Sequence, residues 1–263
     1  MSRYPIPESV KGQPWSDILW EDVLQYTQSL DQFSAVPKQG IIVDIGGNIG
    51  CAAILFHLHY QAKIFSVEAI KETYRSLEKN CEPYPDIIPI HTAIGEFEGQ
   101  MQLYRYPLAP GLGGLEASRR HILVVLWKQA FQNISLNKLV DILLLPFRIL
   151  GLILWMFFCI FIVLLRFKQE VPLQTLSTLF AHYIHDEPIS VLKIDIEGHE
   201  LSALRGLKGA DWSRIQTIIM EVHPQNLAEV TSLLQQHQFS IQSIEKGVIT
   251  LEDAPKVLVA NRL

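Results

Sequence analysis

The sequence contains little of what marks several large classes of protein. It has three cysteines, Cys51, Cys81 and Cys159, and no CxxC pair, so neither a disulfide framework nor a cysteine zinc site is expected. The stretch 1–12 lacks the apolar run of a signal peptide, which together with the cysteine usage favours a reduced, cytoplasmic setting. Charged residues make up 19% of the chain and the net charge is −5, so no overall nucleic-acid footprint is present.

Two familiar nucleotide-binding motifs are also absent. No glycine is followed by the Lys-Ser or Lys-Thr of a P-loop. The stretch Gly46–Gly50 does not complete a Gly-x-Gly-x-x-Gly fingerprint, because Asn48 and Cys51 occupy the second and third glycine positions counted from Gly46. The pattern counted from Gly47 fails in the same way. A nucleotide-dependent oxidoreductase is therefore the less favoured alternative.

The sequence does alternate apolar, strand-like runs with segments of helical periodicity. Strands are expected in the short β-branched run between Gly40 and the glycines that follow it, and at 62–68, 86–91, 191–195, 215–222, 239–244 and 248–251. Helices are expected at 17–30, 51–59, 71–80, 200–207 and 225–238. A hairpin is expected to run through 93–95 and to end near 106. This rhythm is typical of βαβ units in a parallel sheet, which binds ligands at the carboxyl ends of its strands.

A glycine-rich, anionic stretch ends the first expected strand. Its candidate ligand-binding residues are Asp44, Gly46, Gly47, Asn48 and Gly50. The glycines permit a tight turn and a close approach of the backbone to a ligand. Glu68 ends the second strand, where a carboxylate can accept hydrogen bonds from both hydroxyls of a ribose. Because Asp44 suits a cation better than a pyrophosphate, the pattern favours S-adenosylmethionine, which carries a sulfonium, an ammonium and a ribose diol.

Three later residues form the candidate reaction site. Asp195 and Glu197 are two apart, so in extended backbone they point to the same side. His223 ends the next strand and has an intrinsic pKa suited to accepting a hydroxyl proton. Two alternatives stay open: the three side chains hold a divalent metal, or His223 only bonds a loop carbonyl. Glu200 is expected to be a first-turn acid that favours the helix dipole.

A basic and strongly apolar window interrupts the strand pattern. Residues 119–168 contain seven basic side chains and one acid, and 23 of the 27 residues in 139–165 are apolar. Hydropathy alone would make 149–165 a transmembrane helix, at the lower edge of spanning length. A single crossing would separate strands that belong to one sheet, so we expect a monotopic or re-entrant contact on the cytoplasmic side of a membrane. The alternative is a helix buried against the domain or in a dimer interface.

The motifs VDIGGNIG, SVEAI, HTAIGE, LKIDIEGHELSALRG and IIMEVHP resemble, in this order, those of the FkbM family of S-adenosylmethionine-dependent methyltransferases. The resemblance covers 40–110 and 168–225, and it departs at Gly47, where the family usually has alanine. It implies the α/β, Rossmann-like class I methyltransferase fold, a mostly parallel seven-stranded sheet with helices on both faces. In this chain the fold would carry a hydrophobic helical insertion. It also implies O-methylation, often of a sugar or polyketide hydroxyl.

The resemblance also assigns residues and domains. By the family pattern, Asp44, Gly46, Asn48 and Gly50 contact the methionine part of the cofactor, Glu68 takes the ribose, and Ala69 and Ala93 border the adenine. The expected domains are an N-terminal segment 1–38, a methyltransferase domain of 39–118 with 169–263, and a membrane-contacting insertion 119–168. The expected partners are S-adenosylmethionine and a hydroxylated small molecule, glycan or glycolipid. The alternative from another class is a catalytically silent membrane scaffold.

Overall fold

The computed structural model describes residues 5–12, 16–33, 36–105, 167–196, 198–244 and 256–263. The chain divides into two compact units, one made of Met1–Met101 with Glu170–Leu263 and the other of Gln102–Gln169. Within the described ranges, no helix combines the length and the apolarity needed to cross a bilayer. The apolar segment 139–165, the candidate residue Glu197 and the expected strand 248–251 lie outside these ranges.

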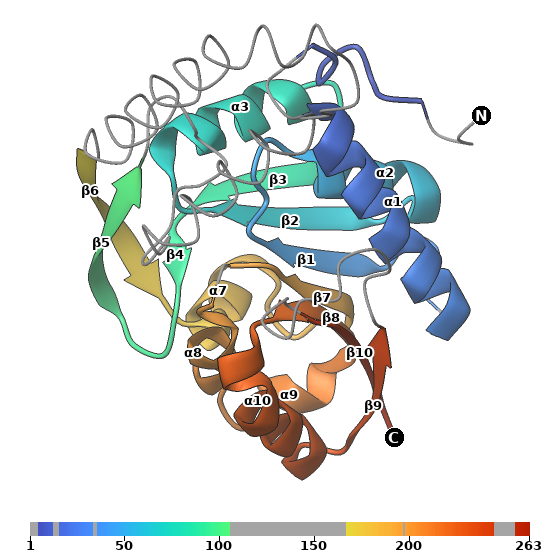
Figure 1. Cartoon of the computed structure of the whole chain (residues 1–263), viewed down its shortest axis with the longest axis vertical. Helices are drawn as coiled ribbons and strands as arrows, with labels where there is room; N and C mark the ends of the chain where they lie inside the picture. Colours follow the sequence, from blue (N-terminus) through green and yellow to red (C-terminus); the bar gives the residue numbers. More distant parts are fainter. Residues whose placement is uncertain (1–4, 13–15, 34–35, 106–166, 197, 245–255) are drawn as a thin grey trace, which may run out of the picture. The chain divides into compact units, whose positions relative to one another are not determined.

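The larger unit is built on a seven-stranded sheet (Figure 1). Across the sheet the strands are β3 (Ile87–His91), β2 (Lys63–Glu68), β1 (Ile41–Ile45), β7 (Ile189–Ile194), β8 (Ile215–Val222), β10 (Lys256–Arg262) and β9 (Phe239–Ile244). The first five run parallel to one another, and β10 runs antiparallel to both β8 and β9. The chain steps outward from β1 to β3 and then returns to β7 on the other side of β1. A topological switch point, where such sheets bind ligands, therefore lies between β1 and β7.

Helices cover both faces of this sheet because its central strands are apolar on both sides. All five residues of β1 are buried; Ile41, Val43 and Ile45 belong to one core cluster, and Ile42 to the other. The first cluster includes side chains of α7 (Leu176–Tyr183), α8 (Glu200–Arg205), α9 (Asp211–Arg214) and α10 (Pro224–Gln236). The second includes α1 (Ser16–Phe33), α2 (Cys51–Tyr60) and α3 (Lys71–Cys81). The seven-stranded, mostly parallel sheet with helices on both faces is confirmed.

A second sheet forms where the sequence predicted a hairpin. Its strands are β4 (Ala93–Ile94), β5 (Gly99–Arg105) and β6 (Phe167–Gln174), in the order β4-β6-β5. The prediction that the chain from 93 to about 106 forms a hairpin is wrong, because β6 lies between the two strands. Ala93 pairs with Leu173 in parallel. Most side chains of β6 are partly or fully exposed, so no regular apolar alternation announced this strand in the sequence.

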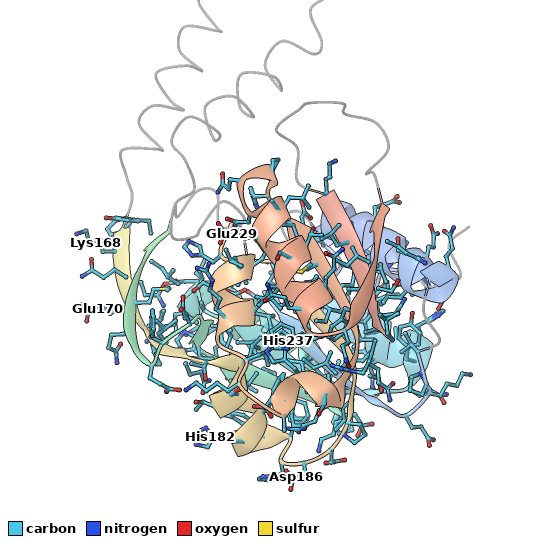
Figure 2. All side chains as sticks on the ribbon, turned by 90° about the horizontal axis from the view of Figure 1, so that it is seen from below. Lys168, Glu170, His182, Asp186, Glu229 and His237 are labelled. Carbon is cyan, nitrogen blue, oxygen red and sulfur yellow. The ribbon has the colours of Figure 1, made fainter. Side chains whose placement is uncertain are left out.

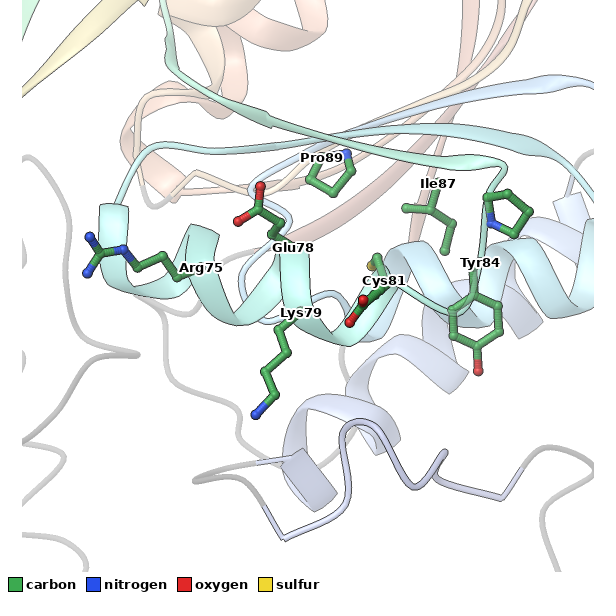
Figure 3. Close-up of a pocket in the computed structure, with 9 residues that line it drawn as sticks. Arg75, Glu78, Lys79, Cys81, Tyr84, Ile87 and Pro89 are labelled. Carbon is green, nitrogen blue, oxygen red and sulfur yellow. The ribbon is translucent and has the colours of Figure 1, made fainter.

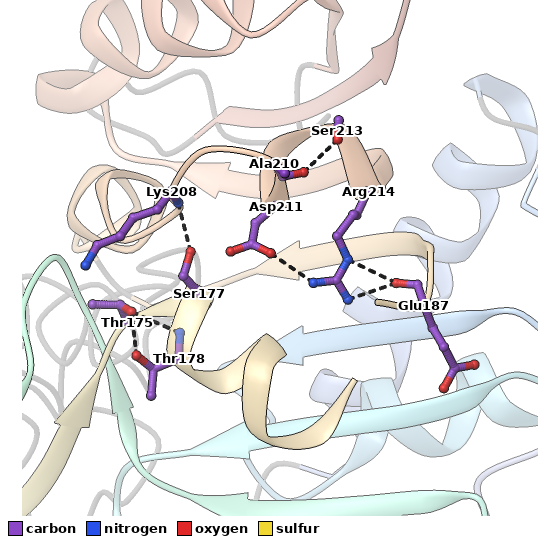
Figure 4. A network of polar contacts seen from close by, with 9 residues as sticks. All are labelled: Thr175, Ser177, Thr178, Glu187, Lys208, Ala210, Asp211, Ser213 and Arg214. Carbon is purple, nitrogen blue, oxygen red and sulfur yellow. Dashed lines mark hydrogen bonds and ion pairs between the residues drawn. The ribbon is translucent and has the colours of Figure 1, made fainter. Parts of the chain in front are cut away.

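A polar network fastens the end of the sheet opposite to the candidate site (Figure 4). The guanidinium of Arg214 donates to the carbonyl of Glu187 at 3.0 and 3.3 Å and pairs with Asp211 at 2.9 Å. Glu187 lies two residues before β7, and Arg214 directly precedes β8. Nearby, the Ser177 hydroxyl of α7 accepts from the backbone N–H of Lys208 at 2.8 Å. The network thus anchors the amino ends of β7 and β8. The candidate site residues lie at their carboxyl ends.

Candidate active site

The glycine-rich turn after β1 has a backbone conformation, and a close approach to β7, that leave no room for side chains. Gly46 and Gly50 have φ angles of 85° and 95°, and Asn48 has a φ of 49°. The N–H groups of Gly46 and Gly47 both donate to the carbonyl of Val67 at 2.9 Å, which ties the turn to β2. A Cβ on Gly46 would collide with the backbone carbonyl of Asp195 after β7. Only glycine therefore fits where the ends of β1 and β7 meet.

The departure from the family pattern at Gly47 has a local cause. A Cβ on Gly47 would collide with the Ser66 hydroxyl oxygen of β2 and would lie 3.3 Å from a methyl carbon of Leu77. The same hydroxyl donates to Asp44 Oδ2 at 2.8 Å. Ser66 thus occupies the space that an alanine methyl would need, and in return it solvates a buried carboxylate.

A chain of buried charges connects the ends of β1 and β7. Asp44 is fully buried, and its Oδ1 lies 3.0 Å from the Nζ of Lys193, its register partner on β7. The same ammonium lies 3.6 Å from Oδ2 of Asp195, whose side chain is 32% exposed. Burial alone would lower the pKa of Lys193, but attraction by Asp44 and Asp195 raises it above its ordinary value. Two carboxylates against one ammonium leave a net negative charge beside the glycine turn.

Glu68 stands at the end of β2 and faces the same turn. Its Oε2 accepts from the backbone N–H of Asn48 at 2.9 Å, and its Oε1 accepts from that of Ile70 at 2.7 Å. Burial raises the pKa of Glu68 to about 7, although these two N–H groups oppose the shift and the charge of Asp44 adds to it. Glu68, the residue predicted to bind the ribose, is therefore in direct contact with the predicted glycine turn.

The two alanines predicted to border the adenine lie on different elements. Ala69 follows Glu68, and its carbonyl lies 3.1 Å from Nε2 of His91 at the end of β3. The His91 ring stacks on Tyr74, with 4.9 Å between ring centroids and 30° between ring planes. Ala93 is buried in β4.

The predicted reaction residues lie at the ends of the adjacent strands β7 and β8. Ile194 pairs with Met220, so Asp195 and His223 leave neighbouring strands at the same edge of the sheet. The Nδ1 of His223 lies 3.4 Å from Oε1 of Glu200, an acid that the sequence assigned only to the helix terminus. In the part of the chain that the structure describes, no group of three or more His, Cys, Asp or Glu side chains could hold a metal ion.

A surface hollow of about 450 Å³ lies elsewhere, between α3 and β3 (Figure 3). It is lined by Arg75, Glu78, Lys79, Cys81, Glu82, Tyr84, Pro85, Ile87 and Pro89. None of these residues was predicted to bind a ligand, and no strand carboxyl end of β1, β7 or β8 opens into it. The burial of the Cys81 thiol raises its pKa to about 12, so this thiol is not a nucleophile at neutral pH. We assign no function to this hollow.

Comparison with known proteins shows which methyltransferases this chain is similar to. A model described as the methyltransferase FkbM domain matches residues 162–241, which include β7, α8, β8 and α10. Over this stretch the chain is similar to FkbM methyltransferases. The 31-O-demethyl-FK506 methyltransferase FkbM of Streptomyces tacrolimicus is 26% identical over 212 residues, which cover 76% of this chain and 73% of the relative. The hexuronic acid methyltransferase AglP of Haloferax volcanii is 24% identical over 207 residues, which cover 78% of this chain and 65% of the relative.

These matches confirm the predicted enzyme class, a methyltransferase, and S-adenosylmethionine as its cofactor. Among solved structures, the magnesium protoporphyrin IX methyltransferase of Synechocystis PCC 6803 with bound cofactor aligns with a TM-score of 0.46 at 7% identity. That alignment covers 100% of this chain and 87% of the other. The class I fold itself follows from the strand order and directions described above.

Proposed function

We propose that this methyltransferase methylates a hydroxyl of a sugar, glycan or lipid-linked glycan. The observation that carries the proposal is the position of His223, a partly exposed imidazole at the end of β8, beside the β7 end that meets the glycine turn. A hydroxyl is a poor nucleophile until it loses its proton, and a positioned imidazole can take that proton. The name of the hexuronic acid methyltransferase supports a sugar acceptor.

The residues at the β1 and β2 ends fit the cofactor. The net negative charge of Asp44, Lys193 and Asp195 favours a cation, and the glycine turn lets the backbone approach closely. Glu68 already accepts two N–H groups and has further lone pairs for ribose hydroxyls. S-adenosylmethionine supplies a methyl group activated by a sulfonium. The proposed binding set is Asp44, Gly46, Gly47, Asn48, Gly50, Glu68, Ala69 and Ala93, with Asp195, Glu197 and His223 toward the acceptor.

We also propose that 139–165 attaches the enzyme to the cytoplasmic side of a membrane, which would bring the site close to lipid-linked acceptors. The support comes from the amino-acid sequence, where 23 of these 27 residues are apolar and basic residues flank them. Such flanks add about 1 kcal/mol of binding per basic residue near an anionic surface.

A methyl-transfer assay tests the acceptor class. The full chain is given S-adenosylmethionine with a labelled methyl group and three kinds of acceptor. These are free sugars, the same sugars on a lipid anchor in vesicles that contain an anionic lipid, and peptide or RNA controls. We expect label in the sugars, with more transfer to the vesicle-borne form and a partial loss of that advantage in high salt. Transfer only to peptide or RNA would contradict the proposal, and cofactor binding without any transfer would favour a silent scaffold.

The Glu68→Ala variant should weaken binding of S-adenosylhomocysteine by about 1.5 to 3 kcal/mol, the range for a hydrogen bond to a charged group. Because the pKa of Glu68 is raised to about 7, the wild type should also lose affinity as the pH falls from about 8 to about 6, when the carboxylate becomes protonated. Calorimetry at several pH values measures both effects.

The matched control is Glu72→Ala, which removes an exposed carboxylate from the first turn of α3. Its affinity should stay close to that of the wild type. In Glu68→Gln the affinity should no longer depend on pH in this range. An affinity that is the same in wild type and Glu68→Ala would remove Glu68 from the cofactor site.

A further inference from the structure

Glu200 is a buried acid that the proposed reaction has not yet used. It is the first residue of α8, and it is fully buried. Its Oε1 accepts from the backbone N–H of Gly198 at 2.6 Å, and its Oε2 accepts from Nδ2 of Asn226 at 3.3 Å. Burial would raise the pKa of Glu200, but the contacts with His223 and with backbone N–H groups lower it overall, so the side chain is ionised at neutral pH.

The surrounding backbone is shaped around this carboxylate. Gly198 has a φ of 94°, a conformation that turns its N–H toward Glu200 and that side chains rarely adopt. The Nδ2 of Asn226 also donates to the carbonyl of Gly198 at 2.8 Å, so the first turn of α10 closes over the same loop. An acid that served only to interact with the helix dipole could lie in solvent, where its ionised form has no desolvation penalty. The burial of Glu200 therefore calls for a partner that uses its charge.

That partner is the imidazole of His223. Its Nδ1 is buried and lies 3.4 Å from Oε1 of Glu200, while the side chain as a whole is 25% exposed. Part of this side chain is therefore exposed although its Nδ1 is buried. The distance is long for a hydrogen bond, as is common for catalytic contacts before substrate binds.

We propose that Glu200 is a positioning residue for His223. It holds the tautomer with the proton on Nδ1 and so presents the lone pair of Nε2 to the acceptor hydroxyl. This inference rests on the proposed function, because it assigns a helper to the base of that reaction.

The step balances with the groups already named. As the acceptor oxygen forms its bond to the methyl carbon, the bond from that carbon to sulfur breaks and its electron pair stays on sulfur. The hydroxyl proton passes to Nε2 of His223, and the resulting imidazolium lies against the carboxylate of Glu200. Glu200 keeps its negative charge throughout and takes no proton.

The Glu200→Gln variant tests this role, because it keeps the size of the side chain and removes its charge. We expect kcat to fall roughly 10-fold or more, with little change in KM and in the affinity for S-adenosylhomocysteine. The loss should be smaller than that of His223→Ala. The rate of Glu200→Gln should also reach its plateau at a lower pH, because the imidazolium has lost the carboxylate that stabilised it and gives up its proton more readily. The Glu200→Asp variant, which retains the charge, should recover part of the rate.

The matched control is Glu229→Gln. Glu229 of α10 pairs with Arg205 of α8 at 2.7 Å, so it joins the same two helices, but both side chains are about half exposed (Figure 2). Such exposed pairs contribute little, and this variant should keep the wild-type rate and pH profile.

A spectroscopic measurement gives a second, independent readout. The ¹⁵N shifts of the His223 ring in the wild type, identified by their loss in His223→Gln, should show the proton on Nδ1. This result does not require Glu200→Gln to fold. A proton on Nε2, or a rate and pH profile of folded Glu200→Gln equal to the wild type, would overturn the proposal. If the proton is on Nδ1 but no hydroxyl acceptor is methylated, the positioning geometry stands and the proposed function fails.

Discussion

Replacing His223 by alanine is expected to lower kcat for a hydroxyl acceptor by about 10² to 10⁴, the range for loss of a general base. Binding of S-adenosylhomocysteine should change little, because the contacts of the glycine turn and of Glu68 lie at the ends of β1, β2 and β7. Single-turnover kinetics at saturating cofactor would separate the chemical step from binding and product release.

The His182→Ala variant is the control for this experiment. His182 lies in the last turn of α7 and is exposed at the edge of the view in Figure 2. Its loss should leave the rate unchanged, which shows that removing a histidine as such is harmless. If the rate after His223→Ala equals that of the control, the end of β8 contributes positioning at most.

The second large effect is expected on stability. The Lys193→Met variant should reduce the free energy of unfolding by about 3 to 5 kcal/mol, because it leaves the buried carboxylate of Asp44 without its ion pair. Chemical denaturation of the full chain measures this loss. The loss should shrink at low pH, where protonation neutralises the carboxylate that has lost its partner.

Two variants define the cause of that loss. Lys208→Met removes an exposed lysine and should change stability by less than about 0.5 kcal/mol. The double variant Asp44→Asn with Lys193→Met removes both charges, so it should be more stable than Lys193→Met alone. If Lys193→Met unfolds like Lys208→Met, the buried ion pair does not hold the ends of β1 and β7 together.

Much of the sheet could be predicted because its central strands are apolar on both faces and are followed by glycine, acidic or histidine residues in recognisable motifs. The run from Ile41 to Ile45, the glycines after it and the acid at Glu68 lie close together in sequence, and local rules relate them. The strand that contains Lys193 and the one that directly precedes His223 were found for the same reason.

Two other strands were not predicted. β6 is mostly polar, and its place between β4 and β5 is decided by partners far away in the sequence. β10 is a short apolar run that enters between β8 and β9, so its neighbours follow from the tertiary fold and not from chain order. Strand pairing of this kind is not encoded in periodicity.

The sequence analysis named candidate ligand-binding residues, whose roles stay predictions, and it missed the residues that contact them. Lys193 lies within an apolar strand, which itself signals a buried acid partner, but only the register identifies that acid as Asp44. Glu200 looked like an ordinary first-turn acid, because its burial and its contact with His223 arise from the packing of α8 against α10.

The chemical stability of the transferred methyl group tests the central claim most directly. The sugar product of the methyl-transfer assay is treated with mild alkali, which hydrolyses a methyl ester to methanol and leaves a methyl ether intact. Our account predicts that the label stays on the sugar, because the acceptor is a hydroxyl that His223 deprotonates. Release of the label as methanol would identify a carboxylate acceptor, which needs no general base, and would contradict the account.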